Sequence, residues 1–373
     1  MSLKRISFIS ARANPGYEDR MRIVEVNAFH YPFMGGIEHR VHHISKRLAG
    51  KHEMTVLTGQ MPGSPAEEVM DGYHVMRLPS KYINIYNPPY IKTPGILEAL
   101  GRLKPDIVDF HYRWSPSYNN AAKRYQGKKA FTFHNTYGEG VGITRFPSIV
   151  NDALWKKPLR KFPRIVCVSD FVRRDLAARD FELDRLVTVP NGIDMPPEMD
   201  AKDGDYILFV GRLVGTKGIP CLLKAMKHVD SKLVVCGGGP DMKKLVKMTE
   251  RLGLKGRVEF PGRVPEDEKM RLFANCGVFV LPSIYESYGI AAAEAMSWGK
   301  PVVASDVGGL PEVVGSGGLL ARPGDPRDLA EKLNTLLKDD AMRKSKGEKA
   351  KALAAGYTWD RAAAMMEKVY ASV

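Results

Sequence analysis

IYESYGIAAAEAMSWGKP, the segment from Ile284 to Pro301, lies between two short apolar runs, VFVLPS before it and VVAS near its end. This order predicts a strand, a loop, a short helix that ends at a glycine, and a second strand. Glu286 is then in the loop above the first strand end, and Glu294 is about one turn into the helix. The backbone N–H groups of Gly289 and Ile290 begin that helix, where unpaired donors and the helix dipole favour an anion.

Two carboxylates flank this predicted anion site. One acid could bind ribose hydroxyls and the other could bind sugar hydroxyls, so the segment indicates a nucleotide-sugar site. The alternative is a buried helix of an α/β domain with two exposed acids. The segment alone does not separate these two interpretations.

The composition favours two globular α/β domains. The chain has 373 residues, of which 44% are hydrophobic and 26% are charged, and this length usually divides into more than one core. No apolar run approaches the roughly 20 residues of a membrane span, and no signal peptide is visible. The four cysteines are widely spaced, which favours free thiols in a reducing compartment. We therefore expect a cytoplasmic protein.

Positive charge is concentrated in the first half of the chain. Residues 1–195 contain 29 Lys and Arg against 19 Asp and Glu, a difference of +10, and the rest contains 27 against 23, a difference of +4. Such an excess indicates an anionic acceptor, a membrane surface or nucleic acid. Since no basic stretch has the spacing of a nucleic-acid-binding motif, nucleic acid is not an expected partner.

Strand-like runs alternate with amphipathic segments from Met21 onward. The runs are RIVEVNA, MTVLTG, DIVDFH, KAFTFHN, RIVCVS and LVTVP in the first half, and YILFVG, KLVVCGGG, RVEFPG, VFVLPS and PVVAS in the second. The pattern predicts two doubly wound units with parallel sheets, separated by a linker at 191–205 that is rich in Pro, Asp and Gly. Ligands of such sheets bind beyond the carboxyl ends of the strands. Residues 1–20 precede the first natural strand and form a possible extension.

Loops after the strands of the second half contain residues suited to a diphosphate. FVGRLVGTKG places Arg212 directly after a strand and Lys217 beside the next helix start, where two cations can clamp a diphosphate. The alternative is a pair of exposed loop charges. Gly239, in VVCGGGP, lets the backbone approach a ligand closely. An NAD-binding motif is excluded there, because Met242 occupies the third glycine position.

Two further loops extend this set. Arg263 and Val264, in FPGRVPEDE, follow a strand and are suited to lining a base. In the first half, HYPFMGGIEHRV places Gly35 and Gly36 at the start of an amphipathic helix that runs to about Leu48. We expect this helix start to face the first one across a cleft between the domains.

In their order along the chain, these motifs resemble those of the retaining GT-B glycosyltransferases, in particular glycosyltransferase family 4. The order is a GG loop, a TFHN strand end, a PNGID linker, a VGRL…KG loop, a GGGP loop, a PGR-V loop, an E-x7-E segment with EAM, and GGLPE. The resemblance implies an α/β GT-B fold, with two Rossmann-like domains whose sheets face a central cleft. It implies an acceptor-binding domain at 1–195, a nucleotide-sugar-binding domain at 196–355, and a C-terminal helix at 356–373 that packs back on the first domain.

The resemblance also implies a role for each matching residue. Glu294 would bind the ribose, Glu286 would hold the donor sugar, and Arg212 and Lys217 would bind the diphosphate. The implied catalytic residues are His134, Arg212, Lys217 and Glu286. The implied donor-binding residues are Gly35, Gly36, Arg212, Lys217, Gly239, Arg263, Val264, Glu286, Ser287, Tyr288, Gly289, Ile290 and Glu294. Candidate acceptor or cleft residues are His111, Asn135 and Asn191, although His111 could instead fill its strand end.

Two groups of residues suggest a metal site. Asp203 and Asp205 form a D-x-D, which another transferase fold uses to hold a metal, but Asp and Gly are common turn residues in a linker. His39, His42 and His43 lie at helical spacing, with no third ligand compellingly placed for zinc. Because cations already stand near the predicted diphosphate, we expect neither a metal nor another cofactor.

The segment ALWKKPLRKFPR, residues 153–164, mixes cations with apolar side chains. It could rest on an anionic membrane, as basic amphipathic segments do, or form a solvated basic linker. The protein would then be cytoplasmic, with peripheral contact at the inner face of the membrane.

We predict a metal-independent retaining glycosyltransferase that moves a sugar from a nucleoside-diphosphate sugar to an acceptor hydroxyl. The acceptor would be a glycan, a lipid or a small molecule. The alternatives are a non-catalytic nucleotide-sugar-binding protein and a GT-B epimerase or phosphorylase.

Overall fold

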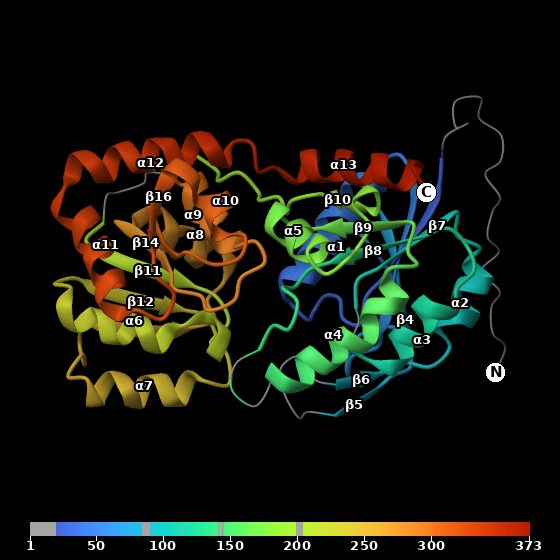
Figure 1. Cartoon of the computed structure of the whole chain (residues 1–373), viewed down its shortest axis with the longest axis horizontal. Helices are drawn as coiled ribbons and strands as arrows, with labels where there is room; N and C mark the ends of the chain where they lie inside the picture. The colour runs from blue at the N-terminus through green and yellow to red at the C-terminus, as the bar shows by residue number, and fades with distance from the viewer. Residues whose placement is uncertain (1–19, 84–89, 113, 141, 143–144, 199–203) are drawn as a thin grey trace.

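The computed structural model describes residues 20–373 except 84–89, 113, 141, 143–144 and 199–203. Two α/β units lie side by side along the long axis, and a C-terminal helix returns from the second unit to the first (Figure 1). Nearly all of the possible extension at 1–20, and Asp203 of the D-x-D, lie outside the described residues.

In the described part of the first unit, eight strands form one sheet in the order β10-β9-β8-β7-β1-β2-β4-β3. Neighbouring strands are parallel except β3 and β4. The strands are β1 (Arg22–Val26), β2 (Glu53–Gly59), β3 (Glu67–Met70), β4 (Tyr73–Leu78), β7 (Ile107–Phe110), β8 (Lys129–Phe133), β9 (Arg164–Cys167) and β10 (Leu186–Thr188).

Two antiparallel pairs were not predicted from the sequence. β5 (Lys81–Ile83) pairs with β6 (Tyr90–Lys92), and β3 pairs with β4. Asp71 and Gly72 both have positive φ between β3 and β4, as a tight hairpin turn requires. The Asp-Gly dipeptide was therefore a usable signal for this hairpin.

The described second unit has six parallel strands in the order β13-β12-β11-β14-β15-β16. These are β11 (Tyr206–Val210), β12 (Lys232–Cys236), β13 (Val258–Gly262), β14 (Val278–Leu281), β15 (Val302–Ser305) and β16 (Gly318–Ala321). The central strands are apolar along their whole length because helices cover both faces of the sheet.

Helices follow most strands, as the alternating pattern predicts. In the first unit they are α1 (Gly36–Leu48), α2 (Ile96–Leu103), α3 (Pro116–Arg124), α4 (Arg145–Leu159) and α5 (Asp170–Ala177). In the second they are α6 (Ile219–Ala225), α7 (Met242–Arg251), α8 (Glu266–Asn275), α9 (Ile290–Ser297), α10 (Leu310–Val314), α11 (Pro326–Lys338) and α12 (Asp340–Ala354). Among the residues described, no helix has both the length and the apolar composition of a membrane span.

The last helix, α13 (Trp359–Ala371), packs against α1 on the first sheet. Trp359 and Met366 of this helix share one buried core with Ile23 of β1 and Ile44 of α1. A bridge between Ile193 and Thr358 joins the two segments that cross between the units. The first unit is therefore completed by the end of the chain.

Candidate functional site

Lys217 and Glu286 meet at the carboxyl edge of the second sheet. Lys217 ends a 3-10 turn after β11, and Glu286 lies in the loop after β14. Lys217 Nζ lies 2.6 Å from Glu286 Oε2, and Ser283 Oγ donates to the same oxygen at 3.2 Å. Both charged side chains are mostly buried. The structure thus joins two predicted catalytic residues in one charge-assisted hydrogen bond.

The backbone at Gly218 allows the two loops to approach each other. Gly218 has φ of 67°, and a Cβ at this position would lie 1.9 Å from the carbonyl oxygen of Pro282. Any other residue would push the Lys217 loop away from the Glu286 loop.

Glu294 extends from α9 toward α8 and forms a second ion pair. Its Oε1 lies 3.2 Å from Lys269 Nζ, which also contacts Glu266 at 2.8 Å. Burial raises the pKa of Glu294, against the lowering effect of Lys269. Burial lowers the pKa of Lys269, but the carboxyls of Glu294 and Glu266 outweigh burial and raise it. Lys269 therefore stays charged and orients Glu294.

Two helix N-termini meet at the boundary between the units. Gly289, whose φ of 102° is in the left-handed region that favours glycine, precedes α9, and α1 begins at Gly36. In the described structure, the capping position of each helix lacks a side-chain hydrogen bond. A Cβ placed on Gly36 would lie 3.8 Å from Ile290 Cδ1. Both capping residues are glycines and have no side chain, and at α1 the Glu38 carboxyl bonds its own backbone N–H. The first N–H groups of α9 and the two helix dipoles make this boundary suitable for an anion.

A buried carboxyl occupies the first turn of α1. Glu38 Oε1 accepts a hydrogen bond from Asn27 Nδ2 at 3.1 Å, and a Cβ on Gly35 would lie 2.5 Å from Glu38 Oε2. Burial raises the pKa of Glu38 to about 7, although its hydrogen bonds and the nearby Arg212 lower it. Glu38 is therefore close to half ionised at neutral pH.

Direct hydrogen bonds connect the two units beside these helix starts. Ser169 Oγ, before α5, donates to the carbonyl oxygen of Ser287 at 2.7 Å. Arg174 Nη2 lies 2.7 Å from Glu312 Oε1, and Asp170 N donates to Glu312 Oε2 at 2.9 Å. The loops at the carboxyl edges of the two sheets are thus held against each other.

His111 and His134 end neighbouring strands of the first sheet. His111 follows β7 and His134 follows β8, and their rings are joined by a hydrogen bond of 2.9 Å between His111 Nδ1 and His134 Nε2. His111 Nε2 bonds to Glu25 of β1. Both ring nitrogens of His111 thus bond to other side chains, as expected for a residue that fills its strand end. A hydrogen bond from His111 to a substrate would have to replace one of these two bonds.

Other predicted residues of the first unit have structural partners. Asn135 Nδ2 donates to Glu139 Oε2 at 3.1 Å. Asn191 Oδ1 accepts from the buried Arg40 at 2.9 Å, so it fastens the linker to α1. The side chain of Tyr288 is buried in a core cluster that contains residues of both units, which leaves its backbone as the part that can reach a ligand.

The remaining predicted donor-binding residues lie in the loops after β11, β12 and β13. A Cβ on Gly239 would lie 2.3 Å from the carbonyl oxygen of Leu213, and one on Gly238 would lie 3.1 Å from Arg263 Nε. Val264 packs on the core, and Arg212 is exposed. These loops therefore contact one another above the same sheet edge.

The two suggested metal sites have different positions. Asp205 directly precedes β11, so it lies at the amino end of the strand, opposite Lys217. His39 and His43 do approach a third group, Asp194 of the linker. Arg47 donates to His43 Nδ1 at 3.0 Å, so the ring proton is on Nε2, which faces Asp194 at 3.3 Å. These hydrogen bonds explain the grouping of His39, His43 and Asp194 as well as a bound metal would.

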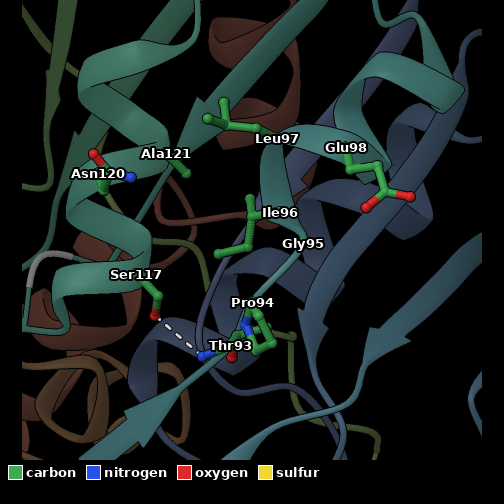
Figure 2. Close-up of a pocket in the computed structure, with 9 residues that line it drawn as sticks. All are labelled: Thr93, Pro94, Gly95, Ile96, Leu97, Glu98, Ser117, Asn120 and Ala121. Carbon is green, nitrogen blue, oxygen red and sulfur yellow. Dashed lines mark hydrogen bonds between the residues drawn. The ribbon is translucent and has the colours of Figure 1, made fainter.

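One pocket of about 320 Å³ lies elsewhere, in the first unit. Figure 2 shows it between the segment that starts α2 and the first turns of α3, with Ser117 Oγ accepting from Thr93 N at 3.1 Å. In Figure 1, α2 and α3 are on the side of the first unit that is remote from the second. This pocket is separate from the ion pairs described above.

Comparisons with known proteins agree with this architecture. The family model described as Glycosyltransferase Family 4 matches residues 34–195, and the one described as Glycosyl transferases group 1 matches residues 194–353. The chain belongs to the family 4 glycosyltransferases of the GT-B fold. The junction of the two matches falls within the segment that connects the units of this glycosyltransferase.

Relatives align with most or with part of this glycosyltransferase. An uncharacterized glycosyltransferase of Methanocaldococcus jannaschii is 28% identical over 92% of this chain and 96% of its own. The phosphatidylinositol N-acetylglucosaminyltransferase gpi3 subunit of Schizosaccharomyces pombe is 28% identical over 93% of this chain and 80% of its own. A D-inositol 3-phosphate glycosyltransferase of Corynebacterium jeikeium is 37% identical, over 43% of this chain and 42% of its own.

Solved structures show the same fold. Sucrose-phosphate synthase from Thermosynechococcus elongatus has a TM-score of 0.81 at 21% identity, covering 95% of this chain and 99% of its own. Anabaena HepE in complex with UDP-glucose has a TM-score of 0.78 at 18% identity, covering 95% and 100%. The GT-B fold expected from the motifs is confirmed.

Sequence reasoning missed several buried charged residues of this glycosyltransferase. Glu25 and Asp109 lie inside apolar strand runs, RIVEV and DIVDF, and an acid within a buried strand was a usable signal. Glu38 lies two residues after Gly36. Lys269 carried no signal, since its pairing with Glu294 depends on the packing of α8 beside α9.

Proposed function

We propose that this glycosyltransferase transfers a sugar, with retention of configuration, from a nucleoside-diphosphate sugar to an acceptor hydroxyl. The observation that supports the proposal most is the Lys217–Glu286 pair at 2.6 Å beside the N-terminus of α9. A diphosphate at that helix end would have Lys217 and Arg212 on one side and backbone N–H groups on the other. Because Anabaena HepE, which shares the fold, was solved in complex with UDP-glucose, UDP-sugars are the first donors to test.

The proposed chemistry is a front-face substitution. A bond forms between the acceptor oxygen and the anomeric carbon, while the bond from that carbon to the diphosphate oxygen breaks. The acceptor proton passes to the leaving diphosphate oxygen. Lys217, Arg212 and the helix N–H groups would stabilise the developing negative charge, so no metal is required. His134 would orient the sugar and the acceptor.

For the acceptor, we propose a hydroxyl compound that carries a phosphate. The excess of +10 in residues 1–195 favours an anionic partner. Two of the three relatives act on inositol compounds that contain phosphate, according to their names. An inositol phosphate and a phosphatidylinositol vesicle are therefore the first two acceptors to compare.

We also propose that α4 rests on an anionic membrane, from which a lipid acceptor would be reached. Within the predicted segment 153–164, Trp155 and Phe162 are buried, so these two side chains are not the ones that would contact a membrane. The exposed apolar side chains of the helix are instead Phe146, Ile149, Val150 and Leu154. Their spacing places them along one side of α4. The protein would thus be cytoplasmic, with peripheral contact at the inner face.

The experiment is a donor screen that measures nucleoside diphosphate release from UDP-, GDP-, ADP- and dTDP-sugars, with and without EDTA. Proton NMR of the product then reports the anomeric configuration. Release that survives EDTA, with retained configuration, supports the proposal, whereas inverted configuration or complete loss in EDTA contradicts it. Binding of sugar nucleotides without release favours a binding protein, and an epimerised or phosphorolysed sugar favours the remaining alternatives.

Two variants test the proposed division of roles between the glutamates. Glu294→Ala should weaken binding of the nucleoside diphosphate itself, since Glu294 is assigned to the ribose. Glu286→Ala should leave that binding nearly intact and impair use of the sugar nucleotide. Titration of both variants with the diphosphate alone decides this point, and equal losses would contradict the assignment.

A further inference from the structure

A connected series of buried polar side chains runs along one face of the first sheet, from α13 to His134. Glu25 of β1 and Asp109 of β7 are partners in the sheet register. Residues two apart in a strand share a face, so Glu25 and Asp109 lie on the same face as Ile23 and Ile107, which α1 and α13 cover. His111 follows Asp109 by two residues and lies nearer the carboxyl edge.

The contacts along this series are continuous. Tyr370 Oη of α13 donates to Glu25 Oε1 at 2.7 Å and lies 3.1 Å from Asp109 Oδ2. The other oxygen of Glu25 bonds to His111 Nε2, and His111 Nδ1 lies 2.9 Å from His134 Nε2. All five side chains are at least nine-tenths buried. The C-terminal helix is thereby linked to the residue that ends β8.

The charges of this buried cluster compensate one another. Isolated charges in a protein interior are costly unless they are paired and hydrogen-bonded. Burial alone lowers the pKa of His111, but the carboxyls of Asp109 and Glu25 outweigh it and raise the pKa above the usual range. Among the described residues, the charged or titratable groups that face His111 are Glu25, Asp109, Arg40, Glu38 and His134. Tyr370 contacts the carboxyls of Glu25 and Asp109.

We propose that Glu25, Asp109 and Tyr370 hold His111 as an imidazolium whose Nδ1–H donates to His134 Nε2, so that His134 keeps its own proton on Nδ1. His111 is then a positioning residue that fixes the tautomer and the ring orientation of His134. Tyr370 contributes to the same arrangement from the far end of the sequence. The consequence for catalysis rests on the proposed function of His134, whereas the protonation pattern does not.

Two-dimensional ¹H–¹⁵N NMR of protein labelled in its nine histidines tests the protonation pattern directly. His111→Asn and His134→Asn variants assign the two rings. At pH 7 we expect two protonated nitrogens on His111, and on His134 a protonated Nδ1 with an unprotonated Nε2. A neutral His111, or a His134 protonated on Nε2, would overturn the proposal, even if Glu25 variants fail to fold.

Kinetics separates positioning from a merely structural role. Glu25→Gln removes the charge and keeps the shape, so His111 should lose its extra proton. We expect kcat to fall by about 10–100-fold, the scale known for residues that orient metal-binding histidines, with unchanged affinity for the nucleoside diphosphate and a shifted pH–rate profile. A lower melting temperature with an unchanged pH profile would mean that the cluster only stabilises the fold.

Tyr370→Phe provides a milder variant with a matched control. It should lower kcat several-fold, whereas Tyr357→Phe, which removes a hydroxyl bonded to Val313 O outside the series, should leave kcat unchanged. Equal effects of the two would count against the proposal. If the NMR pattern is found but no donor is turned over, the proposed function fails and the protonation pattern stands.

Discussion

At the scale of single residues, the carboxyl-edge site consists of ion pairs between loops or helices that follow different strands. Lys217 pairs with Glu286, and Lys269 pairs with Glu294. Each carboxylate already has a cation, so removal of one partner leaves the other charge poorly compensated in a mostly buried place. Substitutions in these pairs are therefore expected to affect binding and turnover to different degrees.

Lys217→Ala should lower turnover by about two orders of magnitude or more, because in the proposed mechanism Lys217 stabilises the leaving diphosphate. The affinity for the nucleoside diphosphate should fall much less. Single-turnover kinetics and titration measure the two effects. Lys224→Ala, an exposed lysine on α6, is the control and should behave as the unmodified protein; equal losses in binding and turnover for Lys217→Ala would indicate uniform binding.

Glu38 should make the protein less stable as the pH rises toward neutrality. Its pKa is about 7 in the folded state and 4.5 ordinarily, so between these values the folded state binds more protons than the unfolded state. Stability is then lost as the pH rises from 4.5 to 7, by roughly 3 kcal/mol in total. Glu38→Gln should remove this loss.

Urea unfolding of the unmodified protein and of Glu38→Gln at pH 5 and pH 8 measures this effect. The variant should gain stability relative to the unmodified protein at pH 8 and much less at pH 5. A constant difference between the two pH values would show that Glu38 titrates normally.

At the scale of secondary-structure elements, α4 presents two different sides. Trp155 and Leu159 pack into the core, while Phe146, Ile149, Val150 and Leu154 are exposed. Of the neighbouring cations, Lys156 and Arg160 pair with Asp180. Arg145, Lys157 and Lys161 are exposed, which makes them the better candidates for contact with lipid headgroups.

Reversal of Arg145, Lys157 and Lys161 to glutamate should abolish binding to vesicles that contain anionic lipid and spare nucleotide binding. The attraction is electrostatic and is screened over about 8 Å at physiological salt, so binding should also weaken with salt. Co-sedimentation of the protein with the vesicles measures this binding. Reversal of Lys338, Lys344 and Lys349, which are exposed on α11 and α12, is the matched control; a protein that stays free of anionic vesicles at low salt would contradict the membrane proposal.

At the scale of the whole molecule, the chain completes its first unit with its last helix. α13 shares a buried core with β1 and α1, and Trp359 stacks on His43 with ring centroids 4.9 Å apart. The end of the chain therefore stabilises the unit in which His134 lies.

Trp359→Ala should destabilise the first unit by about 3–5 kcal/mol, the cost of removing a large buried side chain. Denaturant unfolding followed by a probe in that unit measures the loss. Met342→Ala, on the exposed side of α12, is the control and should change stability by less than about 0.5 kcal/mol. A small effect of Trp359→Ala would mean that α13 contributes little to the fold.

The sequence by itself determined the fold class and the order of the parts. Apolar runs such as VFVLPS, alternating with helical segments, predicted parallel sheets, because period and composition are local properties of the chain. The position of Lys217 and Glu286 after strand ends was predictable for the same reason. Their roles as donor-binding residues remain predictions.

Only the tertiary structure decided which charges meet. The Lys269–Glu294 pair, the contact of Gly36 with Ile290 and the series from Tyr370 to His134 join residues far apart in sequence. The packing of helices on sheets sets these distances, and no local pattern encodes them. The same reason explains why the sequence did not indicate which apolar side chains near residues 153–164 are exposed: a mixed basic and apolar segment does not show which side of its helix faces the core.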